Sequence, residues 1–428
     1  MLEQDNPIRV FEHGCLFVHK GERQTRLTDT QLQALQTLHG EAGLPYYTLI
    51  HKGVKFTEYV GVLQVGNLTI EVLPKADKND DKDRWQQMLI GMLQAVGLFE
   101  IQAPSTSQLS LKSNSILDLY FALFLQEVEY LLHRGLVKKY RKVDSNTTAL
   151  KGSIQFAQHI QKNLVHQERF FVRHTTYDAQ HQMHQILYKT LLLLKRINTN
   201  TALHSKIGSM LLNFPEQPDL KVTEATFEKI VLNRKTESYG KAIEIARLLL
   251  LNYHPDLSKG KNHVLALMFD MNMLWERFVY ISLRKGLRRE NADISIQDQV
   301  HKFFWKPENG NRSKIKPDIV INKDRADCVV LDTKWKNLNG YNPSPDDLRQ
   351  LYVYHQYYHA KKVALIYPAS SQFSKSGKYL CTNTGKETEM ECSVITLTVK
   401  NSIDTWQKSI YNEILDWMGL VESSPDII

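Results

Sequence analysis

The sequence predicts a multidomain α+β protein with a β-rich N-terminal domain, an α-helical middle region and a C-terminal α/β domain. Short runs of alternating apolar residues fill residues 1–76, apolar residues at helical spacing dominate residues 77–259, and strand and helix patterns alternate over residues 260–428. A chain of 428 residues can bury two or three separate cores. We therefore expect three domains with these bounds.

The N-terminal region is predicted to consist mainly of strands. Its strand-like runs are IRVFEHGCLFV, YYTLIHKGVKF, YVGVLQV and LTIEVLP. Gly66-Asn67 lies between the last two runs and is typical of a hairpin turn. Thr28-Asp29-Thr30 precedes QLQALQTL and indicates one short helix. By its own residues this region predicts a small barrel-like fold that supports the rest of the chain.

The middle region follows a mixed charge run at residues 77–83 that indicates a solvated linker or loop. Its amphipathic segments predict several helices, among them ILDLYFALFLQEVEYLLHRGL. Basic residues cluster around Tyr140, and this cluster indicates either contact with a phosphate backbone or a solvated surface; its members are Lys138, Lys139, Arg141 and Lys142. Histidines also gather here, namely His166, His174, His181 and His184, but no cysteine or acid has metal spacing. We expect surface or hydrogen-bonded histidines.

Composition and motifs exclude several classes of protein. The formal charge of +8 fits a polyanionic partner. The four cysteines show neither disulfide nor zinc spacing, which favours a reducing cytoplasm. The polar N-terminus and the lack of a long apolar run predict a soluble protein with no membrane partner. No G-x-x-x-x-G-K-[ST] loop is present, so we expect this chain itself to bind no nucleotide.

A hairpin over residues 315–336 carries the clearest chemical signal. The runs IKPDIVI and CVVLDTKW flank the polar turn NKDRAD. Side chains alternate along a strand, so Asp332 and Lys334 share one face beside Asp318, while the apolar residues of the other face point toward a core. Two carboxylates and a lysine are then expected to meet in a solvent-accessible site.

Such a group suits hydrolysis of a phosphodiester. Carboxylate oxygens bind Mg²⁺, and a lysine can position water or stabilise negative charge. The alternative is a hairpin with a charged, solvated face. Pro317-Asp318 followed by Asp332-Thr333-Lys334 resembles the PD-(D/E)xK nuclease signature, and this resemblance implies a restriction-endonuclease-like C-terminal domain.

The neighbouring segments agree with this resemblance. Upstream, MFDMNMLWERFVYISLRKGL predicts a helix on which Glu276 lies among apolar residues and must be paired, exposed or bound to metal. Downstream, Ser344-Pro345-Asp346-Asp347 predicts a capped helix start. Gln350 and Tyr354 share one face of that helix and resemble the element that follows the DxK strand in RecB-like nucleases. The strand KKVALIYP follows. Beyond it we expect a loop over SSQFSKSGKY, a strand at TLTVK and a closing helix.

Two further segments, YVGVLQVGNLTIEVLPKAD and LKGSIQF, resemble the McrC family, the nuclease subunit of McrBC-type modification-dependent restriction systems. The resemblance implies Mg²⁺, with Mn²⁺ as a substitute ion, held by Asp318, Asp332, Glu276 and the Thr333 backbone carbonyl. It implies that Lys334 acts on water or phosphate and that Gln350 and Tyr354 brace the site or touch DNA.

The same resemblance implies two partners. One is DNA, and the other is an McrB-like AAA+ GTPase hexamer that recognises the modified cytosine, drives cleavage and is stimulated by this chain. The family's N-terminal part contacts the motor, so residues 8–75 are expected to do so as a block. Two alternatives remain open at this stage. The chain could be a catalytically silent DNA-binding or regulatory subunit of such a motor, or an autonomous nuclease.

Overall fold

A computed structural model describes most of the chain. The described residues are 7–18, 26–42, 45–66, 68–76, 81–96, 115–254, 264–290, 293–336, 342–369, 371, 373–400 and 402–420. They form two compact units. One unit comprises Met1–Gln108 with Met268–Ile428, and the other comprises Leu109–Leu267. The division into three domains at residues 76 and 259 stays a prediction. The first compact unit contains residues from both ends of the chain.

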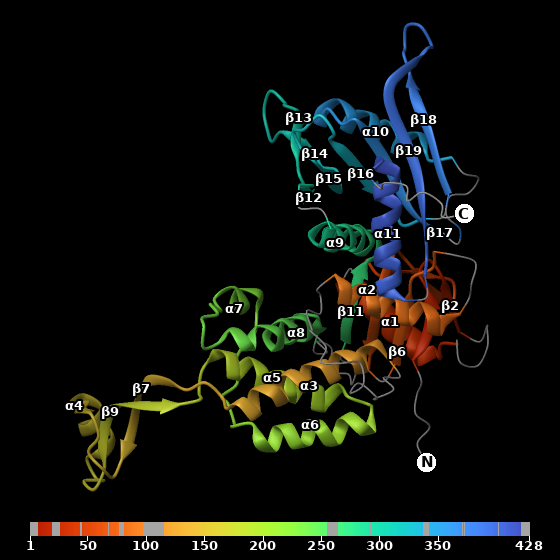
Figure 1. The fold of residues 1–428 in the computed structure, drawn as a ribbon. Helices are drawn as coiled ribbons and strands as arrows, with labels where there is room; N and C mark the ends of the chain where they lie inside the picture. The colour runs from red at the N-terminus through yellow and green to blue at the C-terminus, as the bar shows by residue number, and fades with distance from the viewer. Residues whose placement is uncertain are drawn as a thin grey trace, which may run out of the picture. The chain divides into compact units, whose positions relative to one another are not determined.

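The N-terminal part of the first unit is β-rich (Figure 1). Its elements are β1 (Ile8–Phe11), β2 (Cys15–Phe17), α1 (Asp29–Ala42), β3 (Tyr47–Ile50), β4 (Gly53–Phe56), β5 (Tyr59–Val65), β6 (Leu68–Leu73) and α2 (Lys82–Ala95). One sheet has the order β2-β4-β3, and in another β1 lies beside β6 and β6 beside β5. The expected hairpin is confirmed, because β5 and β6 pair antiparallel with Val65 opposite Leu68. Asn67 of its turn lies outside the described residues.

Helix α2 begins where the predicted charge run ends. The Asp81 side chain accepts hydrogen bonds from the Asp83 and Arg84 backbone N–H groups, which fixes the start of the helix. Residues 77–80 of that run lie outside the described part of the chain. The apolar face of α2 packs against β6 and against the two long C-terminal helices α9 (Met271–Glu290) and α11 (Ile403–Met418). At Gly91 an added Cβ would lie 2.2 Å from the Ile403 side chain, so α2 and α11 approach closely there.

The second unit is mostly helical but contains a sheet that the sequence analysis did not predict. Its elements are α3 (Ile116–Arg134), β7 (Lys139–Thr147), β8 (Ser153–Ile154), α4 (Phe156–Asn163), β9 (Phe170–Asp178), α5 (Gln182–Ile197), α6 (Thr201–Asn213), α7 (Glu224–Glu228), the 3-10 helix η2 (Glu237–Tyr239), α8 (Gly240–Leu251) and β10 (Tyr253–His254). The sheet has the order β7-β9-β8. The residues of β7 are mostly polar or basic, so its sequence has few of the apolar β-branched and aromatic residues that usually predict a strand.

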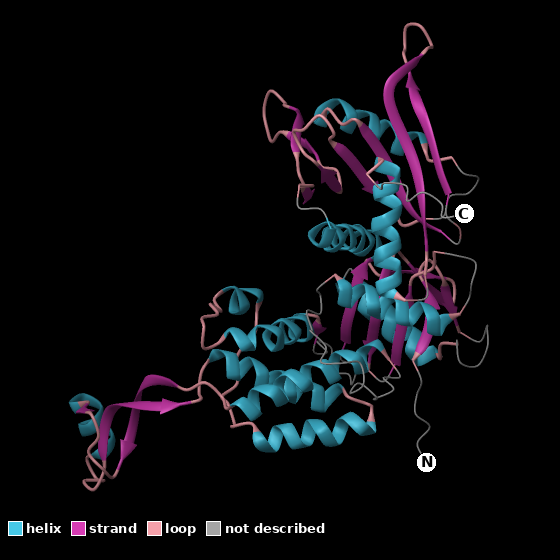
Figure 2. Ribbon diagram, viewed as in Figure 1, coloured by secondary structure: helices cyan, strands magenta, loops and turns pink. Residues whose placement is uncertain are grey.

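The C-terminal part of the chain alternates strands and helices, as Figure 2 shows. Its elements are β11 (Val264–Asp270), α9, β12 (Ile296–Asp298), β13 (Lys302–Trp305), β14 (Ser313–Ile315), β15 (Ile319–Ile321), β16 (Val329–Thr333), α10 (Pro345–Tyr358), β17 (Lys362–Ala369), β18 (Phe373–Leu380), β19 (Glu387–Thr398) and α11. The expectation of a loop over SSQFSKSGKY is wrong, because β18 forms there and pairs antiparallel with β19.

The central sheet of this part has the order β12-β15-β16-β17-β19-β18. Strands β15 and β16 form the predicted antiparallel hairpin, and β16 and β17 are parallel, joined through α10. The predicted first strand, IKPDIVI, is interrupted at Lys316–Asp318. Pro317 has no N–H to donate, so β14 pairs with β13 on one side of it and β15 joins the large sheet on the other.

Strand β16 is buried on both faces. Val330 packs with Leu351 and Tyr354 of α10 in one apolar core, and α9 also contacts β16. The prediction of an exposed face carrying Asp332 and Lys334 is therefore wrong for Asp332, whose exposed fraction is 1%. Helix α10 covers the face of β16 that the alternating sequence pattern predicts to be exposed. The connection between two parallel strands places its helix on a face of the sheet.

Candidate active site

The two acids of the predicted signature lie side by side on neighbouring strands. Ile319 is opposite Leu331 in the register, so Asp318, the residue before β15, lies opposite Asp332 of β16. The Asp318 carboxylate accepts hydrogen bonds from the Thr333 backbone N–H at 2.6 Å and from the Thr333 hydroxyl at 2.8 Å. Asp318 is thereby held against the end of β16.

Lys334 completes this group from the residue after β16. Its Nζ lies 2.8 Å from Asp332 Oδ2 and 3.8 Å from Asp347 Oδ1. Burial disfavours the charged ammonium, but the carboxylates of Asp332, Asp347 and Asp318 outweigh it and raise the pKa of Lys334. The lysine is therefore charged at neutral pH, inside the group of acids.

Glu276 lies close enough to both aspartates to interact with them electrostatically. Burial raises the pKa of Glu276 to about 7, with a further increase from Asp318 and a smaller one from Asp332. A hydrogen bond with Gln299 and the charge of Lys316 act in the opposite direction. Burial also raises the pKa of Asp332 and of Asp318. Three acids in one partly dry region repel each other, and a bound cation relieves that repulsion.

A relay of hydrogen bonds connects the lysine to α10. Lys334 Nζ donates to Gln350 Oε1 at 3.2 Å, and Gln350 Nε2 donates to the Tyr354 hydroxyl at 2.7 Å. The Tyr354 hydroxyl donates in turn to the Lys316 carbonyl at 3.1 Å. The helix begins as predicted, with the Ser344 side chain accepting from the Asp347 N–H and Pro345 in the first turn. This start places Gln350 and Tyr354 against the lysine.

Sequence reasoning missed two acids that reach the same region. Asp347 accepts a hydrogen bond from Lys336 Nζ at 2.6 Å and from the Tyr367 hydroxyl at 3.3 Å, although the sequence suggested only a capping role for it. Glu12 of the N-terminal part accepts a hydrogen bond from Trp335 Nε1 at 2.6 Å. A contact between residues so far apart in the chain leaves no local pattern, so the sequence could not show it.

The donor set fits a hard divalent cation. Among the described residues no group of three or more His, Cys, Asp or Glu side chains could hold a metal ion on its own. Mg²⁺ needs fewer protein ligands, because it is commonly held by one or two carboxylates and keeps waters or substrate phosphates. Asp318 and Asp332 would supply two such carboxylates side by side, and Glu276 interacts electrostatically with both of them.

A cavity of about 620 Å³ adjoins Glu276. Its lining includes Tyr59, Phe269, Met273, Arg277 and Gln299. Of the predicted site residues it contains Glu276, and its volume lies within the usual range for ligand sites.

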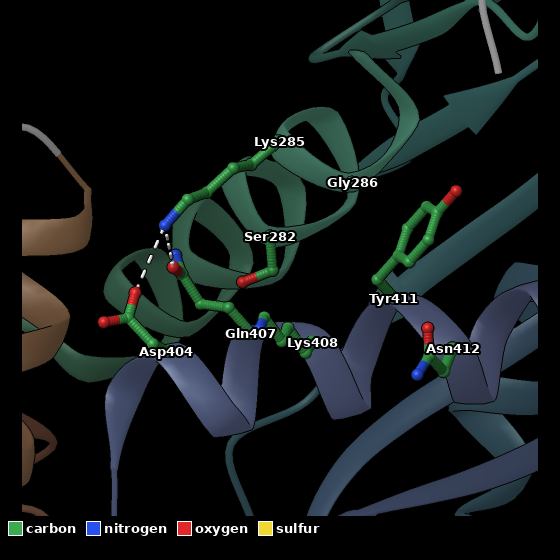
Figure 3. Close-up of a pocket in the computed structure, with 8 residues that line it drawn as sticks. All are labelled: Ser282, Lys285, Gly286, Asp404, Gln407, Lys408, Tyr411 and Asn412. Carbon is green, nitrogen blue, oxygen red and sulfur yellow. Dashed lines mark hydrogen bonds and ion pairs between the residues drawn. The ribbon is translucent and has the colours of Figure 1, made fainter. Parts of the chain in front are cut away.

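A second cavity, of about 500 Å³, lies between α9 and α11 and contains none of the predicted site residues (Figure 3). There Lys285 Nζ donates to Gln407 Oε1 at 2.9 Å and lies 3.3 Å from Asp404 Oδ1. Lys285 is already paired and none of the acids of the candidate site lines this cavity, so it adds nothing to the candidate chemistry.

The other candidates from the sequence are mostly satisfied by neighbours. Arg141 of the basic cluster bonds to Asp178 at 3.0 Å across the β7–β9 pair. His184 is buried, with one ring nitrogen 2.5 Å from the Ala179 carbonyl and the other 2.9 Å from the Tyr239 hydroxyl. Burial lowers the pKa of His184, so it is a neutral hydrogen-bonded residue.

The comparisons with known proteins decide the family. A model of the McrBC 5-methylcytosine restriction system component family matches residues 54–368. The chain belongs to this family. The match confirms the resemblance to McrC and covers the β5–β6 hairpin and the whole Asp318 to Tyr354 region.

Solved structures of the family's complexes share the fold. A half-complex from a tetradecameric assembly of Thermococcus gammatolerans McrB AAA+ hexamers with bound McrC contains a chain of 19% identity and TM-score 0.71, covering 96% of this chain and 100% of that one. The T. gammatolerans McrBC complex gives 19% identity and TM-score 0.51, covering 66% and 88%. No curated protein matches. Within the described residues, no helix has both the length and the apolar character needed to cross a bilayer.

Proposed function

We propose that this protein is the DNA endonuclease subunit of a modification-dependent restriction complex that acts on DNA containing 5-methylcytosine. One observation carries the proposal. Asp318 and Asp332 on paired strands, with Lys334 at 2.8 Å from Asp332, bring together the residues that phosphodiester hydrolysis requires. The family match supports the restriction role.

Each residue of the group has a role that follows from its position. Mg²⁺, when bound, would polarise the scissile phosphate and acidify a water. Asp318 and Asp332 would hold the ion, with the Thr333 carbonyl and Glu276 completing its shell. Lys334, kept charged by its acidic neighbours, would orient the attacking water or stabilise the pentacovalent phosphate. Gln350 and Tyr354 would keep the lysine side chain in one orientation.

The proposal includes a motor subunit. The solved relatives are McrC chains bound to McrB AAA+ hexamers. By analogy, we propose that an McrB-like GTPase hexamer recognises modified DNA, that residues 8–75 of this chain contact it, and that this chain stimulates its GTPase activity. Cleavage would then depend on GTP, although we expect this chain itself to bind no nucleotide.

Reconstitution tests the proposal. The purified chain, an McrB-like partner encoded beside it, GTP and Mg²⁺ are mixed with DNA that carries 5-methylcytosine or with plain DNA of the same sequence. We expect cleavage of the methylated DNA in the complete mixture and loss of cleavage when EDTA, or no GTP, is used. Mn²⁺ should replace Mg²⁺. Cutting without partner and GTP would indicate an autonomous nuclease. Stimulation of the GTPase with no cutting under any condition would indicate a silent regulatory subunit.

A further inference from the structure

An exposed hairpin leads directly into the candidate site. It consists of β13, β14 and their connection, residues 302–316, and we call it the aromatic hairpin. Three consecutive side chains on β13 are exposed, with exposed fractions of 48% for Phe303, 47% for Phe304 and 57% for Trp305. Large aromatic side chains that remain in water at adjacent positions mark a binding surface more often than a structural one.

The aromatic hairpin is also strongly basic. It contains five cations, Lys302, Lys306, Arg312, Lys314 and Lys316, against the single acid Glu308. None of the five forms an ion pair with a carboxylate in the described part of the chain. Three of them lie over an aromatic face. Arg312 and Lys314 are 5.5 Å and 5.3 Å from the centre of the Phe303 ring, and Lys302 is 4.9 Å from the centre of the Tyr358 ring. Lys302 donates to a backbone carbonyl and Lys316 acts electrostatically on Glu276 and Asp318. Lys306, Arg312 and Lys314 are exposed and available to an outside anion.

Helix α10 fixes the aromatic hairpin beside the catalytic group. Lys302 Nζ donates to the Tyr357 carbonyl at 2.8 Å, and the Tyr357 hydroxyl donates to the Phe304 carbonyl at 3.3 Å. At the other end, the Tyr354 hydroxyl bonds the Lys316 carbonyl, two residues before Asp318. Figure 1 shows β13 and β14 next to α10. A ligand bound on this hairpin would therefore lie next to Asp318.

We propose that the aromatic hairpin binds the DNA strand next to the phosphate to be cut, with its cations on the phosphates and its aromatic side chains stacked on bases. Alternating cations and exposed aromatic rings are the combination that proteins use to hold a nucleic-acid strand. A protein partner would match the aromatic rings but would leave an excess of four positive charges to neutralise. The inference rests on the proposed function for its location, but DNA binding can be measured without cleavage.

The first test removes charge from the aromatic hairpin. The full-length triple variant Lys306→Gln/Arg312→Gln/Lys314→Gln is compared with Lys221→Gln/Lys229→Gln/Lys235→Gln, which removes the same charge from exposed positions of the other unit. Affinity for a labelled duplex is measured by fluorescence anisotropy in EDTA over a range of salt concentrations. We expect a loss of at least about tenfold for the hairpin variant and a salt slope reduced by up to about 3, at roughly 0.9 for each phosphate contact. The control should bind within about twofold of wild type.

The second test follows stacking. Among the six tryptophans, Trp305 is the exposed one. We expect single-stranded oligonucleotides to quench the tryptophan fluorescence of the full-length chain, and Trp305→Ala to remove that quenching and weaken binding about tenfold, because stacking on one base contributes about this much. Trp305→Phe should restore binding but not quenching. Melting temperatures of all variants are measured first, and exposed positions are expected to leave them unchanged.

The outcomes separate this inference from the proposed function. Equal DNA affinity for the hairpin variant and its control would overturn the inference, even if the wild type cuts DNA. Hairpin-dependent binding with no cleavage in the reconstituted mixture would retain the inference and overturn the nuclease. A variant that loses association with the motor while its DNA affinity is unchanged would identify a protein contact and also overturn the inference.

Discussion

At the scale of single residues, the site depends on charged side chains that are largely buried. Asp332 is buried, and its oxygen Oδ2 lies against Lys334. Burial favours the neutral form of Asp332, while the nearby ammonium of Lys334 favours the carboxylate. Removing either side chain would leave the other charge buried without its partner. A substitution here should preserve shape, since removing a buried side chain would disturb packing as well as charge.

Asp332→Asn should reduce Mg²⁺-dependent cleavage by at least about a hundredfold and change the melting temperature little, because an amide keeps the shape but loses the ligand charge. Asp332→Ala should also abolish cleavage, although the burial of Asp332 makes its effect on folding harder to separate. Asp346→Asn is the matched control, since Asp346 is an exposed acid on the same helix start as Asp347. Normal cutting by the Asp332→Asn protein in the reconstituted mixture would disprove the assignment.

Glu12 should make stability depend on pH. Burial raises the pKa of Glu12 to about 7 from its usual 4.5, opposed by hydrogen bonds from Trp335 and Lys75. Between these values the folded chain holds a proton that the unfolded chain has lost, so the stability that Glu12 contributes is greatest below pH 4.5 and is lost as pH rises through 7. Glu12→Gln should abolish this pH-dependent decrease in the free energy of unfolding, which amounts to up to about 3 kcal/mol. Urea unfolding at pH 5, 6, 7 and 8 measures it; parallel pH profiles for the two proteins would contradict the prediction.

At the scale of elements, the helix that carries Glu276 is fixed by close packing on the closing helix. The Tyr411 ring of α11 lies over Gly286 of α9, where an added Cβ would be 2.2 Å from the ring (Figure 3). Tyr411 is buried. The position of Glu276 therefore depends on a glycine two to three turns further along the same helix.

Gly286→Ala should destabilise the protein by roughly 1–2 kcal/mol, because overpacking costs about 1–3 kcal/mol and outweighs the roughly 1 kcal/mol that alanine gains as a helix former. Gly208→Ala is the control. Gly208 lies within α6 with nothing near its added Cβ, so this change should stabilise by about 0.5–1 kcal/mol. Thermal melting distinguishes the two variants. An equal gain in both would show that α9 and α11 separate easily at Gly286.

At the scale of the whole molecule, the candidate nuclease region shares its core with the start of the chain. Buried residues of α2, including Trp85, Met88 and Met92, face α9 and α11. Glu12 bonds Trp335, whose ring meets Trp275 at 5.5 Å between centroids. In the sequence, residues 109–267 separate the two segments of this unit and form a unit of their own.

A fragment of residues 260–428 should consequently be less stable than a chain in which residues 1–108 are joined to residues 268–428 by a flexible linker. The isolated fragment exposes the apolar surface that α2 covers and leaves Trp335 without Glu12. We expect it to aggregate or to melt without a cooperative transition, and the joined chain to melt cooperatively. Calorimetry and light scattering compare them. An equally stable isolated fragment would favour the division into domains at residue 259.

The sequence by itself determined the strand hairpin of Asp318 and Asp332, the capped helix of Gln350 and Tyr354, and the family. These depend on turn residues, alternation and spacing, which are local. Only the tertiary structure decided that β16 is covered on both faces, that Asp347 turns toward Lys336 and Tyr367, and that Glu12 reaches Trp335. The basic sheet of β7 and β9 and the aromatic hairpin also appeared only there. The physical reason is that burial and charge pairing depend on which distant segment packs over a residue, and such packing has no period in the sequence.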